Sequence, residues 1–517
     1  MIRPLRSAAA VFALLPAALA AQLPMITVPA GALRIDATGA FYPSNDIWDN
    51  GGTRPFGSLL NAANNGMVTS LERGLSQAIG QPVTGLTLGG ISAIADRAHG
   101  VGDIGLALGV TKRITIFGTV PIVYVRTQVS MTYTPAAGRL GFNPASTLLG
   151  TAQGRDQTTT FFSDFDAALA ALSDRIQQGA YTGDPASLTL AQQTLSSGTA
   201  MRGSLFSLLA DQTHASAVLP VSTDPAAVQL IGTITTLQST LANRLGVADF
   251  TSLPALPASP LTSDDFGTLL GSPGGFGVTL PNSILHFGLG DMTTGVAIQL
   301  RDRPAASGAG HQAAWLRLTA RLPTATVADQ SVLLEQPTGS KSPAVTADAI
   351  VEVAKSHLGL RAEATYQHQF AASEVERVAS PDAPLVPASF LAAITTQPGD
   401  SIAITARPFF RFAPHLALAG VLQYWRLTAS NTSYLAGQAP IPGVDASVLD
   451  IGSAANAVVV GIGLSYSHDG VGRDGHTGSP VEAGWSIERT IASGAGIFPA
   501  ALTTRVYLRI YRPLLRH

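Results

Sequence analysis

Strict alternation of apolar and polar residues recurs along the chain, mainly after residue 283 and again near residue 100. In the segment LRLTARL, residues 316–322, the even positions are apolar and most odd positions are polar. The segment RVYLRIY, residues 505–511, shows the same period with Val506, Leu508 and Ile510 on one face. A period of two is typical of β-strands that have one apolar and one polar face. The pattern therefore predicts an all-β protein.

The alternation predicts about twelve strands, with fourteen as the alternative count. We expect them near residues 83–92, 101–110, 114–127, 285–301, 311–323, 346–356, 358–370, 401–412, 416–429, 456–468, 480–490 and 500–513. Predicted tight turns alternate with long, Pro- and Ser-rich connections, as in bacterial outer-membrane barrels, where short turns face the periplasm. An even strand count places both termini on the periplasmic side.

The polar faces of these strands favour a membrane barrel over a soluble sandwich. Many consist of Gly, Ala, Ser or Thr instead of the Lys and Glu mixture of a solvated sheet. Only 12% of the 517 residues are Asp, Glu, Lys or Arg, and the mean hydropathy is +0.27. This composition excludes a disordered chain. A net charge of -2 without a basic run argues against a nucleic-acid partner.

The first twenty residues have the features of a cleaved export signal. Arg3 and Arg6 precede an apolar run, and Ala18-Leu19-Ala20 forms a small-residue cleavage site, so we expect cleavage after Ala20. The alternative, an N-terminal anchor, requires a longer apolar run. No other window approaches the ~18 apolar residues of a spanning helix. An exported apolar chain is then either a soluble protein or a closed barrel, and the strand faces favour a barrel in the bacterial outer membrane.

Two regions depart from the strand pattern. Residues 21–81 contain one alternating stretch, 33–37, and we interpret the region as an N-terminal plug or periplasmic segment. Residues 135–282 are predicted to form a helical insertion that caps the barrel. Asp184-Pro185 and Asp224-Pro225 each combine an N-cap residue with proline at the first helical position, and Leu245-Gly246 is a helix end signal. The first barrel strands then occupy 82–134 and the remaining ones 283–517.

A short motif occurs twice. Gly102-Asp103 opens a strand that leads through a tight turn to a second strand ending in Val120-Pro121, and Gly290-Asp291 leads likewise to Leu322-Pro323. In these features the sequence resembles the outer-membrane barrels grouped with the meta-pathway phenol-degradation proteins, over residues 83–130 and 283–513. Those barrels are similar to the long-chain fatty-acid transporters. The resemblance implies a barrel with an N-terminal plug that moves hydrophobic molecules across the outer membrane, although the helical insertion departs from that family.

Signals for catalysis or cofactors are weak. The chain contains no cysteine, which excludes disulfides and thiolate metal sites, and its histidines form no metal-binding motif. The G-x-G-x-x-G match at 100–105 is followed by a strand, whereas dinucleotide binding requires a helix there. Ser486 lies in an incomplete G-x-S-x-G motif and is interpreted as a lumen residue. We therefore expect no enzyme activity, no catalytic residues, no cofactor and no metal.

Assigning the polar face of each strand to the interior gives a set of candidate lumen-lining residues. These are Arg301, Arg317, Arg321, Arg361, Glu363, Arg407, Arg411, Glu482, Glu488, Arg505 and Arg509. Eight arginines stand against three glutamates. Either the arginines pair with these and other carboxylates, or the lumen is positive and favours carboxylate-bearing solutes.

The leading functional hypothesis is a channel or transporter for small hydrophobic or amphiphilic molecules, with anionic ones as one option. The alternatives are a structural or surface-interaction barrel and, less favoured, an outer-membrane lipolytic enzyme. The expected partners are outer-membrane lipid or lipopolysaccharide and a small solute.

Overall fold

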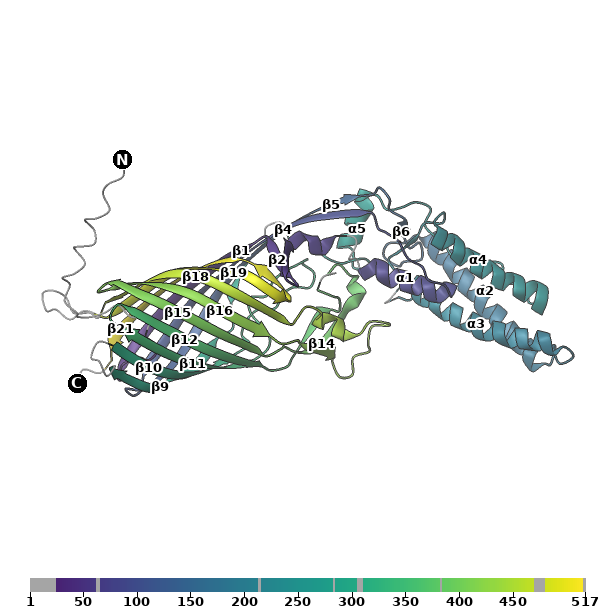
Figure 1. The fold of residues 1–517 in the computed structure, drawn as a ribbon. Coiled ribbons are helices and arrows are strands. Elements are labelled where there is room, and N and C mark those ends of the chain that lie inside the picture. The colour runs from purple at the N-terminus through teal and green to yellow at the C-terminus, as the bar shows by residue number, and fades with distance from the viewer. Residues whose placement is uncertain are drawn as a thin grey trace, which may run out of the picture.

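Twelve antiparallel strands form a closed barrel, which confirms the fold class expected from the sequence (Figure 1). A computed structural model of the chain describes residues 25–61, 66–212, 215–281, 284–304, 310–381, 384–468 and 479–514. The barrel strands are β1 (Ala32–Ser44), β4 (Gly90–Gly109), β5 (Ile114–Thr134), β9 (Thr293–Pro304), β10 (Gly310–Arg321), β11 (Ala344–Lys355), β12 (Leu358–Gln369), β15 (Ser401–Ala413), β16 (Leu416–Leu427), β18 (Ala455–His468), β19 (Val481–Ala495) and β21 (Leu502–Pro513). One further strand, β8 (Ile284–Leu289), pairs with β5 directly before β9.

The strand that closes the barrel is β1, which the sequence analysis assigned wrongly to a plug. It pairs with β21 on one side, from Ala32↔Pro513 to Phe41↔Thr504, and with β4 on the other. A second error compensates for this one, because residues 83–92 form no separate strand and β4 is a single strand of 20 residues. The count of twelve is therefore right, although two of its assignments were wrong.

The outer surface of the barrel is apolar. Outward positions such as Ile462, Leu464, Val506 and Leu508 are all more than 40% exposed. On β15, exposed apolar side chains continue from Ile402 to Phe412. These ten steps correspond to about 34 Å along the strand, or about 26 Å across a membrane at a tilt of ~40°. That height matches the apolar band of transmembrane barrels, about 25 Å.

The helices gather beyond the barrel end opposite the two termini (Figure 1). They are α1 (Gly66–Ile79), α2 (Ala152–Gln177), α3 (Pro185–Leu209), α4 (Pro225–Ser239) and α5 (Ser263–Gly271), with the short helical turns η2 (Phe56–Leu60), η4 (Thr240–Arg244), η5 (Ala388–Phe390) and η6 (Ala446–Asp450). No helix in the described part of the chain is long and apolar enough to cross a membrane. Residues 45–61 and 66–81 lie at this end, so they are not a plug or periplasmic segment at the terminal end.

Three small sheets lie outside the barrel wall. They are β13 (Ala372–Arg377) with β14 (Leu391–Gln397) and β17 (Asn431–Tyr434), β2 (Asp46–Asp49) with β3 (Gly52–Pro55) and β20 (Ile497–Ala500), and β6 (Leu140–Phe142) with β7 (Val218–Pro220). The first of these belongs to the long connections between barrel strands.

The helical insertion begins its helices where the sequence predicted. Asp184 caps α3 and Asp224 caps α4, each through a side-chain oxygen that accepts a hydrogen bond from the second residue after it. Gly246 follows η4 with a φ of +69°, a conformation that glycine adopts without strain. Phe161 and Phe165 are fully buried between the helices. The insertion thus shares one hydrophobic core with η2, α1 and the ends of β4 and β5. The expected signal peptide lies outside the described residues.

Substituting Ile462 tests whether the outer face contacts lipid. Ile462 lies near the middle of β18 with its side chain 48% exposed. Ile462→Arg should lower the free energy of unfolding in phospholipid vesicles by about 2–4 kcal/mol, because a charge near the bilayer midplane is costly. Leu148→Arg is the control, since Leu148 is 61% exposed in the helical insertion. Denaturant titrations followed by tryptophan fluorescence give both values, and equal effects would contradict a lipid-facing β18.

The small sheet β13–β14–β17 should lose local stability as the pH rises. Burial and the neighbouring Glu374 raise the pKa of Glu376 to about 7, against an opposing contribution from Lys341. Between about pH 4.5 and 7 the unfolded segment carries an ionised Glu376 while the folded one holds it neutral, so folding weakens over that range. In hydrogen exchange, the protection factors of the β13 and β14 amides, which are corrected for the intrinsic pH dependence of exchange, should be lower at pH 8 than at pH 5.

Glu376→Gln should remove this dependence, whereas Glu374→Gln should only reduce it, because burial contributes more to the shift than Glu374 does. Unchanged pH dependence in Glu376→Gln would assign the effect to another group.

Candidate functional site

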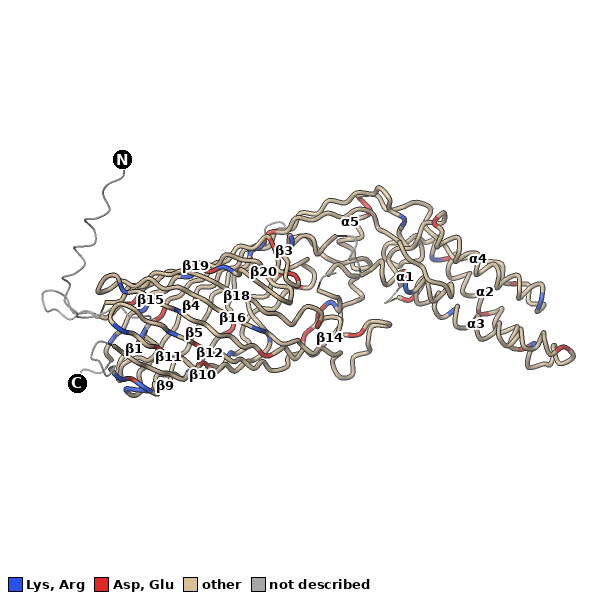
Figure 2. The backbone as a smooth tube through the Cα atoms, in the orientation of Figure 1, with Lys and Arg blue, Asp and Glu red and all other residues tan. Residues whose placement is uncertain are grey.

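Ion pairs line the inside of the barrel. Six arginines each lie within 4 Å of a carboxylate that also points inward. The arginines are Arg34, Arg317, Arg361, Arg407, Arg505 and Arg509, and the carboxylates are Asp36, Asp348, Glu352, Glu363, Glu482 and Glu488. In Figure 2, red and blue positions recur along the barrel strands of a chain that is otherwise mostly uncharged. The alternative in which inner arginines pair with carboxylates therefore describes this lumen.

Glu363 on β12 links strands on both of its sides. Its two carboxylate oxygens accept hydrogen bonds from Arg317 on β10 and Arg407 on β15, both at 3.0 Å. Arg317 also donates to Asp348 on β11 at 2.7 Å. Four adjacent strands thus share one charge network. Nearby, Arg361 donates twice to Glu352 at 2.8 and 2.5 Å, and both side chains are almost fully buried.

A second group of ion pairs, on β1, β19 and β21, holds the N-terminal segment 25–31 inside the barrel. The carbonyl oxygen of Met25 accepts hydrogen bonds from Arg34 at 2.9 Å and from Arg509 at 3.1 Å. The Met25 amide donates to Glu482 at 3.1 Å. Because the charged groups bind backbone atoms, this end of the segment has a fixed position.

Segment 25–31 crosses the lumen. Its first residue binds β1, β19 and β21, whereas Ile26 packs against the buried cluster that contains Trp315 and Ile350 on β10 and β11. Val28 donates its amide hydrogen to Thr115 on β5 at 2.8 Å. Contacts with strands on several sides of the barrel mean that the segment obstructs the lumen. The described part of the expected plug is therefore confined to these few residues.

A cavity of about 340 Å³ remains beside the segment. Ile26 and the paired residues Arg317, Arg361, Glu363 and Arg407 line one part of it, and Glu488, Arg505 and Arg509 another. Between them the wall is made of small residues on β16 and β18. These include Ala419, Gly463 and Ser465. Small inward side chains leave the space that larger ones would fill, so the cavity lies against β16 and β18.

Most of the residues predicted from sequence to line the lumen therefore lie around this cavity, but four do not line it. Glu482 is buried and holds Met25. Arg321 donates to the Ser342 carbonyl and to Gln369, and Arg411 donates to the Ser356 carbonyl. Arg301 is exposed and follows a register shift between β9 and β10, where it pairs with Ala314. A shift of one residue moves a side chain to the other face, so strand alternation alone misplaced Arg301.

Six inner charged residues of the barrel strands were missing from the sequence-based set. Arg97 and Asp103 lie on β4, opposite the inward positions Ser44 and Thr38 of β1. Arg34 and Asp36 lie on β1, which was not recognised as a barrel strand. Asp348 and Glu352 lie on β11, a strand that was predicted. They alternate with the exposed Val351 and Val353, and this pattern identifies their inward direction. Including all six reduces the expected excess of arginine from five to two, nine inner arginines against seven carboxylates, without Arg301.

Ser486, which the sequence analysis interpreted as a lumen residue, is among the residues that line the cavity. Ser486 donates to Glu488 at 3.1 Å, and no histidine is among the described residues that line the cavity. In the described ranges, no group of three or more His, Asp or Glu side chains is placed to hold a metal ion.

Removing carboxylates from two of the ion pairs should have unequal effects. Glu352→Gln deprives the buried Arg361 of its carboxylate and should cost about 3–5 kcal/mol of unfolding free energy. Glu488→Gln should cost less than about 1 kcal/mol, because its partner Arg505 is 55% exposed. Urea unfolding in vesicles measures both. Similar costs would mean that water reaches both pairs equally.

Comparisons with known proteins give structural likeness only. No protein-family model and no curated protein matches the sequence. The fold is similar to an outer membrane channel from Pseudomonas putida F1, with a TM-score of 0.40, 9% identity and coverage of 96% of this chain and 99% of that one. The transport unit of the Escherichia coli autotransporter AIDA-I gives a TM-score of 0.31 and 5% identity, with coverage of 94% of this chain and 93% of that one. The P. putida toluene transporter TodX gives a TM-score of 0.26 and 10% identity, with coverage of 95% of this chain and 92% of that one. With TM-scores below 0.5, these likenesses assign no function.

Proposed function

We propose that the chain is a bacterial outer-membrane channel or transporter for small hydrophobic or amphiphilic molecules. The observation that carries the proposal is a closed barrel with an apolar exterior that surrounds an internal cavity of about 340 Å³. A closed barrel satisfies all its backbone hydrogen bonds within the wall, which lipid requires. A cavity of this size falls at the lower end of small-molecule sites. The residues that line it are then the path of the solute.

The orientation follows from the lengths of the connections. Three turns at the terminal end are short, 110–113, 356–357 and 414–415, whereas the helices and most long loops gather at the other end. Barrels of the outer membrane keep short turns in the periplasm. In this orientation residues 135–282 form an external cap, residues 25–31 form a plug near the periplasmic mouth, and residues 1–20 are the cleaved export signal.

The paired charges suit uncharged and weakly amphiphilic solutes. Each of the six paired arginines is compensated by a nearby carboxylate, so the lumen presents polar groups without a strong field of one sign. The net excess of two inner arginines gives a small preference for anions. Apolar and small side chains between the pairs, such as Ile26 and Ala419, provide the surface for an apolar solute.

Shortening the plug should speed permeation. Deleting Met25–Val28 removes the contacts that cross the lumen, so uptake of N-phenyl-1-naphthylamine by cells that display the protein should rise severalfold over the full-length protein. Deleting Gly437–Pro440, four exposed loop residues, is the matched control and should leave the rate unchanged.

Heat-modifiable gel mobility of outer-membrane fractions checks that both variants fold. If the full-length protein and the plug deletion both fold correctly and both give the same uptake as cells that lack the protein, the channel proposal is wrong. The surface-interaction alternative then takes its place.

A further inference from the structure

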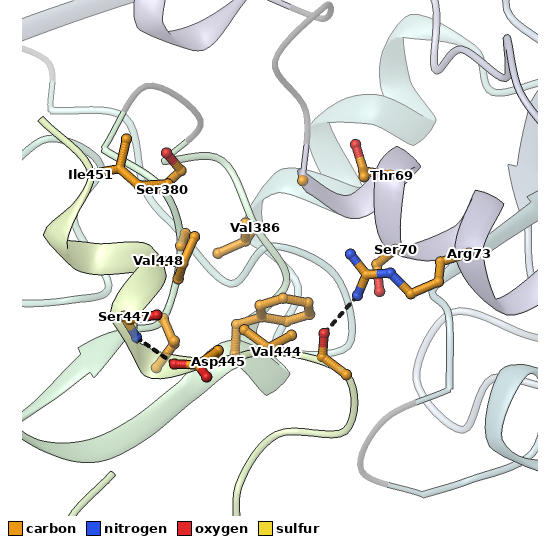
Figure 3. Close-up of a pocket in the computed structure, with 15 residues that line it drawn as sticks. Thr69, Ser70, Arg73, Ser380, Val386, Val444, Asp445, Ser447, Val448 and Ile451 are labelled. Carbon is orange, nitrogen blue, oxygen red and sulfur yellow. Dashed lines mark hydrogen bonds between the residues drawn. The ribbon is translucent and has the colours of Figure 1, made fainter. Parts of the chain in front are cut away.

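A groove lies between α1 and the loops around η5 and η6, at the barrel end opposite the termini. It consists of two cavities, of about 520 and 330 Å³. Ser70, Arg73, Phe390 and Gly443 line both of them. In Figure 3, Arg73 reaches from α1 toward the opposite loop, and its Nη1 donates a hydrogen bond of 2.8 Å to the carbonyl oxygen of Gly443. This bond crosses the groove where the two cavities meet.

The two cavities differ in their walls. The larger one is mainly apolar, with Val378, Val386, Val444, Val448 and Ile451 around Phe390. Figure 3 shows Val386 and Val448 facing the open space opposite Arg73. The smaller one has hydroxyl groups from Ser70, Ser204, Ser207 and Ser389. The groove therefore offers an apolar compartment and a polar compartment that meet at a single guanidinium group.

The Arg73 guanidinium has further N–H donors available to a ligand. Within the described residues its guanidinium makes one hydrogen bond, to Gly443, and no carboxylate lies within ion-pair distance of it. The other charged residue of the groove, Asp445, is already engaged, since its carboxylate accepts a hydrogen bond of 2.8 Å from the Ser447 amide. That hydrogen bond and one from the Ser447 hydroxyl hold the pKa of Asp445 below its usual range. A carboxylate ligand would therefore be attracted to Arg73 and not to the end of the groove near Ser447.

We infer that this groove binds an amphiphile with one carboxylate and an apolar body. The carboxylate accepts hydrogen bonds from the Arg73 guanidinium, which matches its planar geometry, and the apolar body lies against Val386 and Val448. Binding of this kind is a property of the groove alone. Its role as the first station of uptake, on the external side, rests on the proposed transport function.

A pair of probes that differ only in the headgroup tests the binding. The protein in lipid nanodiscs is titrated with 4-(4-fluorophenyl)butanoate and with 4-(4-fluorophenyl)butan-1-ol, and ¹⁹F NMR measures the bound fraction against empty nanodiscs. The wild type should bind the carboxylate about tenfold more tightly than the alcohol, corresponding to one charge-assisted hydrogen-bonded contact.

Three variants locate the contact. Arg73→Gln should abolish the preference for the carboxylate, and Arg73→Lys should retain part of it, because the charge remains while the planar pair of donors is lost. Val448→Ser should weaken the binding of both probes equally. Arg126→Gln is the matched control, since Arg126 is an exposed arginine of β5 outside the groove, and it should change nothing.

The two proposals fail in different ways. Equal affinity of the wild type for both probes, or an unchanged preference in Arg73→Gln, overturns the carboxylate site whatever the uptake rate. A preference for the carboxylate that is lost in Arg73→Gln supports the site. If, at the same time, the plug deletion leaves uptake at the level of cells without the protein, the transport function is overturned instead.

Discussion

The structure depends on one constraint, the closure of the backbone hydrogen-bond network around the barrel. Inside a bilayer no water can satisfy an open strand edge, so each strand of the wall needs two partners. The last link is β1, which pairs with β21 and β4 and so joins the end of the chain to its beginning. Without β1 both of those strands would present unpaired backbone groups to lipid. The twelve strands, the common side of the termini and the position of the long loops all follow from this closure.

Closure also determines how the interior is filled. A twelve-stranded wall encloses more space than its Gly, Ala and Ser positions occupy, and the protein fills part of it with long arginines. Like charges in such a confined, partly desolvated space repel strongly, so each needs a counter-charge nearby. Glu363 serves two arginines from adjacent strands, and Asp36 lies within 4 Å of both Arg34 and Arg509. These pairs link neighbouring strands across the sheet and leave the cavity where β16 and β18 carry only small inward side chains.

Sequence periodicity predicted most of the wall because lipid on one side and a lumen on the other impose a period of two. It failed where another signal interfered. Segment 33–37 was assigned to a plug because counting it as a thirteenth strand would place the N-terminus on the outer side. In β4, Gly100, Gly102 and Gly105 interrupt the alternation, so the sequence does not show that residues 90–109 form one long strand. The register shift after Gln299 turns Arg301 away from the cavity. The ion pairs and the Arg73 groove join residues far apart in the chain, and single-sequence patterns carry no information about such contacts.

Segment 25–31, which obstructs the lumen, runs directly into β1, which closes the wall, and Gly31 is the residue at their junction. Its amide donates to the Gly109 carbonyl, its own carbonyl accepts from the Leu514 amide, both at 2.9 Å, and its φ of +71° turns the chain from the wall into the lumen. A non-glycine residue is strained in that conformation. Since these bonds fix Gly31 to β4 and to the residue after β21, any displacement of residues 25–30 must pivot there. The barrel therefore stays closed in lipid whether the segment lies inside the lumen or outside it.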